Sequence, residues 1–322
     1  MNDDASPTMV SVIVPTHERP NLLARLLQSL QAQTWPIDRF EIIVVHNYTD
    51  DGTDRVVAEI ASTSPVSITY HRVDFSSPGP SRQFGAERSR GTVLAFIDDD
   101  CEATADWIRA GVAALGDGAG LAQGRTLPHP GQPRRLLERT ISVTGETPYF
   151  ETCNIFYRTE AFHAVGGFPP EFRERFGAED TALGWATKRA GFHTAFAPNA
   201  LVYHEVFAVS LRAWLLEPRK LRHWPFLVRA FPELRRHLFL RVFLSPLTAT
   251  FDLAVGGLLL AILLHPAGLA LVLPYIGVRL VDRGRFRAPH ILLARLICGI
   301  PRACVLIGTL MLSSLRARRL VL

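Results

Sequence analysis

The sequence predicts an α/β domain with a mostly parallel sheet, followed by a basic and strongly apolar helical region. In the first 100 residues, runs of β-branched residues alternate with stretches that have helical periodicity. The charge then changes sign along the chain: residues 1–204 hold 18 Lys and Arg against 25 Asp and Glu, whereas residues 205–322 hold 17 against 5. A basic and apolar half favours an anionic membrane surface over nucleic acid as a partner.

The α/β interpretation rests on the order of the elements. We expect buried strands at 10–14, 41–45, 66–73 and 92–97, helices at 21–31 and 54–61, and a short helix at 85–90. Further along, residues 125–135 suggest an irregular segment, 178–190 a helix and 194–203 a strand. Ligands of such sheets bind beyond the carboxyl ends of the strands, which is where the acidic run at 98–100 falls.

Asp98, Asp99 and Asp100 directly follow the fourth predicted strand. Three adjacent carboxylates there repel one another and lose hydration, and a divalent cation would neutralise them. A cation beside a diphosphate can stabilise a leaving nucleotide. The alternatives are a solvated acidic turn or an Asp that caps the next helix.

Five ordered motifs across residues 9–205 resemble those of the family-2 inverting glycosyltransferases. The motifs are Ser11–Pro20, Ser29–Pro36, Phe96–Asp100 (similar to the DxD strand end), Gly166–Phe168 and Glu179–Asp180. The resemblance implies a GT-A fold and a metal-dependent, hexosyltransferase-like enzyme. It would move a sugar from a nucleotide-diphosphate sugar to a hydroxyl acceptor, for example in a cell-envelope glycan.

The resemblance also implies a set of donor-side and metal-binding residues. Mn²⁺ or Mg²⁺ would bridge the diphosphate from Asp100 and Asp98, and His204 would complete the metal shell. The donor site would comprise Pro15, Thr16, Glu18, His46, Arg82, Asp98 and Asp99. For Arg82 a surface salt bridge is the alternative, and a lone His such as His204 can equally be structural.

His46 is a departure from the family pattern. It stands where the family commonly has an aspartate that contacts the base or the ribose, so the resemblance does not specify the nucleotide. A neutral histidine can still donate one hydrogen bond and accept one. The alternative is that His46 only packs at the strand end.

On the acceptor side, Asp180 resembles the family's catalytic base at the start of a helix. The base would remove the proton of the acceptor hydroxyl, and the positive helix end would keep the carboxylate ionised. Glu179 would orient rather than react, and an ordinary acidic first turn is the alternative. Gly166 and Gly167 would bring backbone close to the sugar, and Asn154 would be either a wall of the donor-sugar site or a structural residue.

The C-terminal part divides into basic amphipathic helices at 206–241 and a membrane domain at 242–322, after a glycosyltransferase domain at 1–205. In the membrane domain we expect a helical hairpin at 242–281 and an interfacial or re-entrant helix at 290–315. Arginine clusters at 235–241, 283–287 and 316–319 would then all face the cytoplasm. The alternative is three buried helices of a soluble protein.

These expectations place the protein at the cell membrane, with its catalytic domain in the cytoplasm, because the polar N-terminus resembles no signal peptide. Its partners would be a nucleotide-sugar donor, a glycan or lipid-linked acceptor and the bilayer, with no nucleic acid. A nucleotidyltransferase that forms nucleotide sugars is one alternative, although its glycine-rich phosphate loop is missing after the first strand. A non-catalytic membrane scaffold that kept the fold is the other.

Overall fold

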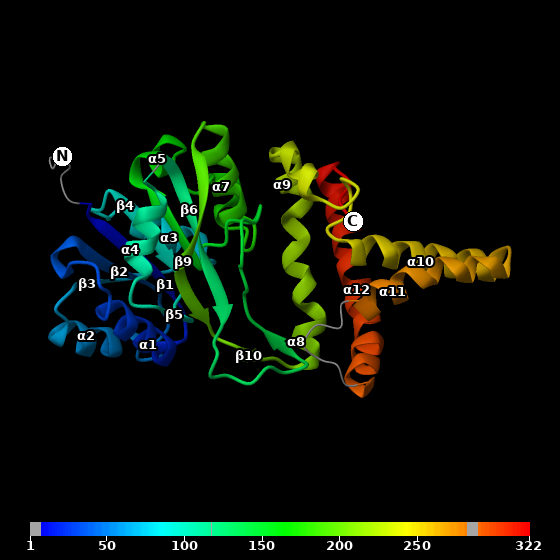
Figure 1. Ribbon diagram of the computed structural model, residues 1–322, viewed down its shortest axis with the longest axis horizontal. Coiled ribbons are helices and arrows are strands. Elements are labelled where there is room, and N and C mark those ends of the chain that lie inside the picture. The colour runs from blue at the N-terminus through cyan, green and yellow to red at the C-terminus, as the bar shows by residue number, and fades with distance from the viewer. Residues whose placement is uncertain (1–7, 117, 282–288) are drawn as a thin grey trace. The chain divides into compact units, whose positions relative to one another are not determined.

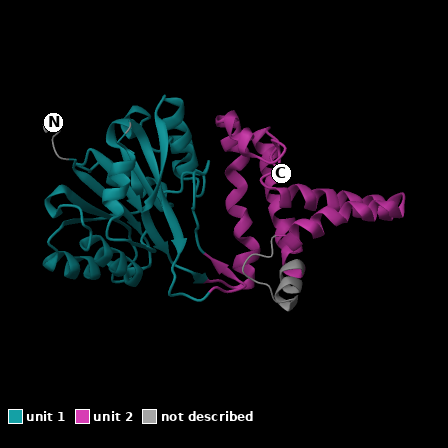
Figure 2. Cartoon of the chain, viewed as in Figure 1, with its two compact units in different colours: residues 1–133, 140–207 teal, residues 134–139, 208–322 magenta. Residues whose placement is uncertain are grey.

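The computed structural model describes residues 8–116, 118–281 and 289–322, with only the backbone for 289–296. The chain divides into two compact units, one of residues 1–133 and 140–207 and one of residues 134–139 and 208–322 (Figure 2). The arginine cluster expected at 283–287 lies outside the described residues.

The first unit is built on an eight-stranded sheet with the order β3-β2-β1-β4-β8-β6-β9-β5 (Figure 1). Neighbours β3–β2, β2–β1, β1–β4 and β6–β9 are parallel, whereas β8 is antiparallel to both β4 and β6, and β5 to β9. The expected α/β class with a mostly parallel sheet is confirmed. The strands are β1 (Val10–Thr16), β2 (Phe40–Asn47), β3 (Ser67–Val73), β4 (Val93–Ile97), β5 (Cys101–Ala103), β6 (Ala119–Pro128), β8 (Asn154–Arg158) and β9 (His193–His204).

Helices connect these strands and supply the apolar faces that cover the sheet. They are α1 (Pro20–Gln31), α2 (Thr53–Thr63), α3 (Pro78–Ala86), α4 (Trp107–Ala114), α5 (Thr159–Ala164), α6 (Pro170–Arg173) and α7 (Glu179–Arg189), with a 3₁₀ turn η1 (Ile37–Arg39). The leucines of α1 illustrate the packing, because their helical spacing places Leu23, Leu26, Leu27 and Leu30 on one fully buried face. They join β1, β2 and β4 in one hydrophobic core.

Two local expectations were wrong. The helix expected at 85–90 lies earlier, as α3, because Ser77 and Pro78 form its start and proline is favoured in the first helical turn. The segment 125–135 is not wholly irregular, because residues up to Pro128 belong to β6 and pair with β9. Composition alone did not reveal that the strand extends this far.

The second unit begins with short helical elements. They are α8 (Leu211–Leu216), η2 (Glu217–His223), α9 (Trp224–Ala230) and η3 (Pro232–His237). The sequence suggested a pair of amphipathic helices here, but Pro218, Pro225 and Pro232 each stand in the first turn of a new element. Proline cannot continue a preceding helix, so the prolines divide the segment. The strands β7 (Glu138–Arg139) and β10 (Phe207–Ala208) form a separate two-stranded sheet.

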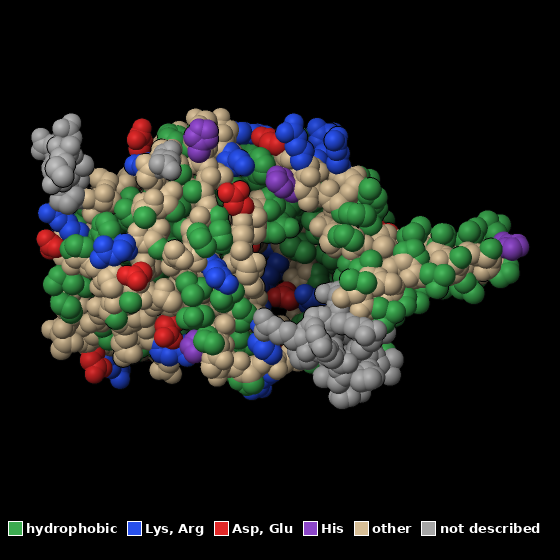
Figure 3. All heavy atoms as spheres, in the orientation of Figure 1, with side chains coloured by type: hydrophobic (Ala, Val, Ile, Leu, Met, Phe, Trp, Pro, Cys, Tyr) green, Lys and Arg blue, Asp and Glu red, His purple; other side chains and the backbone are tan. Residues whose placement is uncertain are grey.

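The apolar part comprises α10 (Pro246–Leu263), η4 (Pro266–Val272), α11 (Leu273–Val281) and α12 (Pro289–Ala317). The backbones of α10 and η4 approach closely at two glycines. A Cβ on Gly257 would lie only 2.6 Å from the carbonyl oxygen of Gly268. Phe251 and Tyr275 pack nearby with ring centroids 5.2 Å apart. Figure 3 shows hydrophobic side chains along α10, many of them exposed.

Among the described residues, two helical segments are long and apolar enough to cross a membrane, Pro246–Leu263 and Ile297–Ala317. The second lies within α12, which continues past Pro301 as one helix. About a quarter of each is buried, at 28% and 22%, which is less than a core helix of a soluble protein would show. Length and composition alone make this weak evidence, so the expected position of these helices in a bilayer stays a prediction.

Candidate active site

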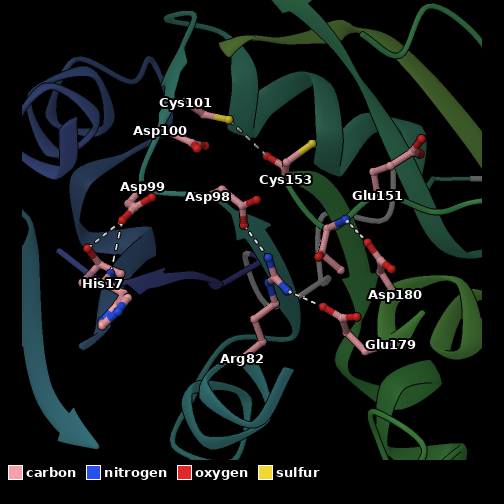
Figure 4. A network of polar contacts seen from close by, with 12 residues as sticks. His17, Arg82, Asp98, Asp99, Asp100, Cys101, Glu151, Cys153, Glu179 and Asp180 are labelled. Carbon is pink, nitrogen blue, oxygen red and sulfur yellow. Dashed lines mark hydrogen bonds and ion pairs between the residues drawn. The ribbon is translucent and has the colours of Figure 1, made fainter. Parts of the chain in front are cut away.

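The carboxyl ends of β1 and β4 lie side by side because the two strands are parallel neighbours. The acidic run that follows β4 therefore meets the turn that follows β1. The Thr16 hydroxyl donates to Asp99 Oδ2 at 2.8 Å, and the backbone N–H of His17 donates to the same oxygen at 3.4 Å (Figure 4). Asp99 thus ties the two strand ends together.

Arg19, in the same turn, lies against two of the three aspartates. Its Nη1 donates to Asp99 Oδ1 at 2.9 Å and to Asp100 Oδ2 at 2.7 Å. Burial raises the pKa of Asp99 to about 7 although Arg19 lowers it, and Asp100 adds to the rise. For Arg19, burial opposes the charge, but the aspartates raise its pKa above the ordinary value. The three aspartates therefore favour a nearby cation, and Arg19 supplies part of the positive charge.

The remaining oxygen of Asp100 faces His204, whose Nε2 lies 3.4 Å from Oδ1. The cause is the pairing of β5 with β9, which places His204 opposite Cys101. Asp98, the other expected ligand, contacts Arg82 instead. Among the described residues no group of three His, Cys, Asp or Glu side chains has the geometry of a metal site. Two carboxylates and an imidazole are nevertheless a donor set that suits Mn²⁺, so the residue types fit the metal.

Arg82 on α3 connects the strand end to the start of α7. Its Nη2 donates to Asp98 Oδ1 at 2.5 Å, and its Nη1 lies 3.5 Å from Glu179 Oε1. In Figure 4 both carboxylates point at the guanidinium. Arg82 is 4% exposed, which rules out the surface salt bridge considered from the sequence. Burial opposes its charge, but Asp98 and Glu179 raise its pKa, so it stays a cation.

Glu179 and Asp180 open α7, as expected. The Asp180 carboxylate accepts from the backbone N–H of Thr181 at 3.0 Å and of Thr152 at 3.5 Å. Burial raises the pKa of Asp180 above its usual range, against the opposing effect of Arg82. Burial and the nearby Asp180 raise the pKa of Glu179 to about 8. Both carboxyl groups therefore bind a proton more readily than they would in water.

The glycines at 166 and 167 shape the loop beside α3. Both have a φ of +74°, which favours glycine. A Cβ on Gly167 would lie 2.2 Å from Gln83 Oε1, the atom that accepts from the N–H of Phe168 at 2.9 Å. Gly79 similarly leaves room for the carbonyl of Arg173, 2.1 Å from where its Cβ would stand. The loop and α3 fit together closely, next to Arg82.

His46 is completely buried at the end of β2. Its Nδ1 lies 2.7 Å from the Tyr70 hydroxyl, and its Nε2 lies 3.6 Å from Asp51 Oδ1. Burial lowers the pKa of His46, although Asp51 raises it, so the ring is neutral at pH 7. The carboxylate of Asp51 thus lies close to the imidazole of His46. Sequence reasoning did not suggest this contact.

The remaining expected site residues divide into buried and exposed. Asn154 is buried, accepts from Trp107 Nε1 at 2.8 Å, and donates to the carbonyls of Arg125 and Ala200 at 2.9 Å each. Its amide therefore holds β8, β6 and β9 together. Pro15 is buried in β1, whereas Glu18 turns outward with a φ of 54° and a side chain that is 64% exposed.

Sequence reasoning missed Arg19 and Glu151. Glu151 accepts from the Thr147 hydroxyl at 2.9 Å, and burial, with Asp180 close by, raises its pKa. Arg19 could have been found by asking which cation shares a sheet edge with the three aspartates. Glu151 lies in an irregular segment, and no periodicity marks it.

Comparison with known proteins agrees with this geometry. A family profile described as Glycosyl transferase family 2 matches residues 11–176, which is more than half of the chain. The chain belongs to this family. The match covers β1, the acidic run and the loop that contains Gly166 and Gly167.

Two known proteins are similar over a longer stretch. Glycosyltransferase AglE of Haloferax volcanii is 28% identical over 210 residues, covering 61% of this chain and 66% of that protein. Succinoglycan biosynthesis protein ExoM of Rhizobium meliloti is 30% identical over 222 residues, covering 65% and 71%. The chain thus spans about two thirds of the length of these relatives.

Solved structures show the same fold. Mannosyltransferase PcManGT from Pyrobaculum calidifontis, in complex with GDP-Man and Mn²⁺, has a TM-score of 0.59 at 17% identity and covers 95% of this chain and 87% of its own. S. aureus TarS 1–349 with UDP-GlcNAc has a TM-score of 0.52 at 17% identity, with coverages of 87% and 93%. The GT-A fold expected from the sequence is confirmed.

Proposed function

We propose that this glycosyltransferase moves a sugar from a nucleotide-diphosphate sugar to a hydroxyl acceptor, with inversion at the anomeric carbon. One observation supports this most directly: Arg82 contacts both Asp98 and Glu179, at 2.5 and 3.5 Å. This contact supports a single site formed by the strand end, which would bind the diphosphate, and the helix start that carries Asp180. An inverting transfer needs these two functions on opposite sides of one anomeric carbon.

The donor side is the edge formed by Thr16, Asp98 and Asp100. Solved structures of the same fold are described with GDP-Man and Mn²⁺ and with UDP-GlcNAc, which supports a nucleotide-sugar donor here. Asp100, Asp98 and His204 would hold Mn²⁺ or Mg²⁺, which would stabilise negative charge on the leaving diphosphate. Arg19 would have to release Asp100 when the metal binds, because both use the same carboxylate.

On the acceptor side, Asp180 would act as the general base. Its carboxylate takes the proton of the acceptor hydroxyl while that oxygen forms a bond to the anomeric carbon. The bond from the anomeric carbon to the diphosphate breaks in the same step. A raised pKa brings a carboxylate nearer to the operating pH and so makes it a more effective base. Glu179 would orient the site through Arg82.

The choice of nucleobase in the donor would involve His46, Tyr70 and Asp51. Because His46 is buried and neutral, it would not attract the nucleobase or the ribose by charge. It would instead determine the shape of the strand end that the nucleotide contacts. Pro15 and Glu18 would border the nucleotide at the end of β1. The acceptor would be a glycan or a lipid-linked molecule, reached at the cytoplasmic face of a membrane that the apolar helices enter.

Donor hydrolysis by the purified full chain tests the proposal. We would screen UDP-, GDP- and dTDP-sugars, with and without Mn²⁺, for thermal stabilisation and then for release of the nucleoside diphosphate. We expect one nucleotide class to stabilise the protein and to be hydrolysed only with the metal. Binding without hydrolysis or transfer would instead indicate a scaffold that kept the fold.

A further inference from the structure

Arg19 stands at a position where a helix usually begins with a different kind of residue. It is the N-cap of α1, directly before Pro20, and its side chain makes no capping hydrogen bond. Ser, Thr, Asp and Asn are favoured at an N-cap, and a cation is disfavoured beside the positive end of a helix. The backbone of Arg19 is nevertheless fixed, because its carbonyl accepts from the N–H of Leu23 at 3.0 Å. The guanidinium therefore does not stabilise the helix start, and its contacts lie elsewhere.

The contacts of the guanidinium are with the acidic run after β4. One nitrogen, Nη1, donates to Asp99 Oδ1 at 2.9 Å and to Asp100 Oδ2 at 2.7 Å. The side chains of Asp99 and Asp100 are only 5% and 7% exposed, whereas that of Arg19 is 35% exposed. Arg19 is thus the member of this cluster that water reaches most easily. Its guanidinium can leave toward solvent, whereas the two carboxylates are fixed in the interior.

Asp99 keeps other donors if Arg19 moves. Its Oδ2 accepts from the Thr16 hydroxyl at 2.8 Å and from the backbone N–H of His17 at 3.4 Å. These two donors belong to the strand end and the turn, so they stay in place when a side chain rotates. Asp99 can therefore remain an anchor between β1 and β4 while the guanidinium leaves Asp100.

Asp100 faces a histidine whose tautomer the backbone determines. His204 Nδ1 lies 2.8 Å from the carbonyl oxygen of Glu205, which can only accept, so Nδ1 carries the hydrogen. In the neutral ring Nε2 then has a lone pair, and it lies 3.4 Å from Asp100 Oδ1. A lone pair and a carboxylate oxygen that face one another favour a cation, and a carbonyl behind the ring is the usual support of a metal-binding histidine. Arg19 supplies a positive charge to the other oxygen of the same carboxylate.

We propose that Arg19 competes with the metal for Asp100, so that tight metal binding depends on the nucleotide. In the metal-free protein Arg19 neutralises Asp100, and it has to give up this contact before a metal ion can use the carboxylate. The displaced guanidinium would also repel the ion. A diphosphate removes both costs, because its oxygens accept from a guanidinium in bidentate geometry and bring negative charge. The inference rests on the proposed function and adds to it a coupling between metal and donor.

A competing cation and a purely structural arginine give opposite results in one comparison. Removal of a structural contact would weaken metal binding together with the stability of the metal-free protein. Removal of a competing cation should also lower the metal-free Tm, because two buried carboxylates lose their partner. It should nevertheless strengthen the binding of free metal, because nothing has to be displaced. Metal affinity in the absence of donor is therefore the decisive measurement.

Titration of the EDTA-treated full chain with Mn²⁺ in a neutral detergent, followed by the EPR signal of free Mn²⁺, provides this measurement. Arg19→Gln and Arg19→Met remove the charge but keep a long side chain, and each should bind Mn²⁺ about tenfold more tightly than the wild type. UDP, GDP and dTDP are then added in turn. The nucleotide that binds should tighten Mn²⁺ binding by a factor about tenfold smaller in the variants than in the wild type.

Arg55→Gln, exposed on α2, is the matched control. It should have the wild-type Mn²⁺ affinity, the wild-type response to nucleotide and the wild-type Tm. Circular dichroism verifies folding, and the two different substitutions at Arg19 guard against the failure of one.

The proposal is overturned if the folded Arg19 variants bind Mn²⁺ no more tightly than the wild type, if the effect of nucleotide is unchanged in them, or if Mn²⁺ binds to none of the proteins. Donor hydrolysis by the wild type, assayed separately with Mn²⁺, distinguishes the two ideas. Hydrolysis by the wild type, with unchanged Mn²⁺ affinity in the variants, would contradict the competition alone. Tighter Mn²⁺ binding by the variants of a protein that hydrolyses no donor would contradict the glycosyltransferase proposal alone.

Discussion

The two units of this glycosyltransferase differ in the sign of their excess charge. In the first, carboxylates outnumber their cations at the sheet edge: Arg19 serves both Asp99 and Asp100, and Arg82 serves both Asp98 and Glu179. The C-terminal part has the opposite balance, with 17 Lys and Arg against 5 Asp and Glu over residues 205–322. The first unit is therefore acidic at the edge of its sheet, whereas the helical unit is basic and apolar.

The difference shows that net charge alone describes this chain poorly. The overall value of +5 combines an acidic catalytic part with a basic helical part. Such an asymmetry favours partners of opposite charge for the two parts of the chain. The following changes test the two sides in order of expected effect.

Asp180→Asn should cause the largest loss. The amide keeps the shape of the side chain but cannot accept the acceptor proton, so transfer should fall about 10²- to 10⁴-fold. Donor affinity, measured by thermal stabilisation, should persist. The control is Asp38→Asn, whose carboxylate is 74% exposed and far along the chain in η1. Wild-type turnover by Asp180→Asn would remove this residue from the mechanism.

Asp100→Asn should mainly abolish the response to metal. Weaker coordination should eliminate the extra stabilisation by donor that Mn²⁺ provides, and with it most of the metal-dependent hydrolysis. Asp50→Asn, in the exposed turn after β2, should respond to Mn²⁺ as the wild type does. An unchanged metal titration in Asp100→Asn would show that the acidic run is only structural.

Arg82→Gln should shift the pH dependence of transfer. Arg82 lowers the pKa of Asp180, so its loss should raise that pKa further. Because the base acts only when deprotonated, the rising acidic limb of kcat/KM should move to higher pH. Arg88→Gln, at an exposed position just after the same helix, should leave the limb in place. An acidic limb at the wild-type pH in Arg82→Gln would show that Arg82 does not affect the pKa of Asp180.

Glu217→Gln should have the smallest effect. Its pair with Arg302 is partly exposed, at 27% for each side chain, so the loss should be about 1 kcal/mol or less. We expect a decrease of a few degrees in Tm, with no change in donor hydrolysis. Glu59→Gln, exposed on α2, provides the control. A decrease as large as that expected for a fully buried pair would show that the surroundings of Glu217 and Arg302 are more tightly packed than their exposure indicates.

The sequence predicted the elements that local patterns determine. The strand before Asp98 is a buried apolar run, and the acidic start of α7 is visible from Glu179 and Asp180 alone. The segment 155–158 also has a strand-like pattern, and it forms β8. Its antiparallel direction and its place between β4 and β6 could not be predicted, because they depend on long-range pairing rather than periodicity. The contact of Arg19 with Asp100 was missed for the same reason, since it requires β1 and β4 to be neighbours.

The helical unit shows another limit of sequence patterns. Its basic and apolar composition predicted helices, but the positions of Pro218, Pro225 and Pro232 determine where each begins. Residues brought together across elements, such as Arg279 and Gly299, leave no local signal at all. Their relation appears only when α11 and α12 are placed in three dimensions.

The glycine contact between α10 and η4 has a consequence for the assembly of the apolar hairpin. Close approach of two backbones gains its energy from van der Waals packing, which works as well in hydrocarbon as in water. The hairpin can therefore stay closed where the hydrophobic effect offers no help. A bulky residue at Gly257 should separate its arms even though every other apolar side chain is retained.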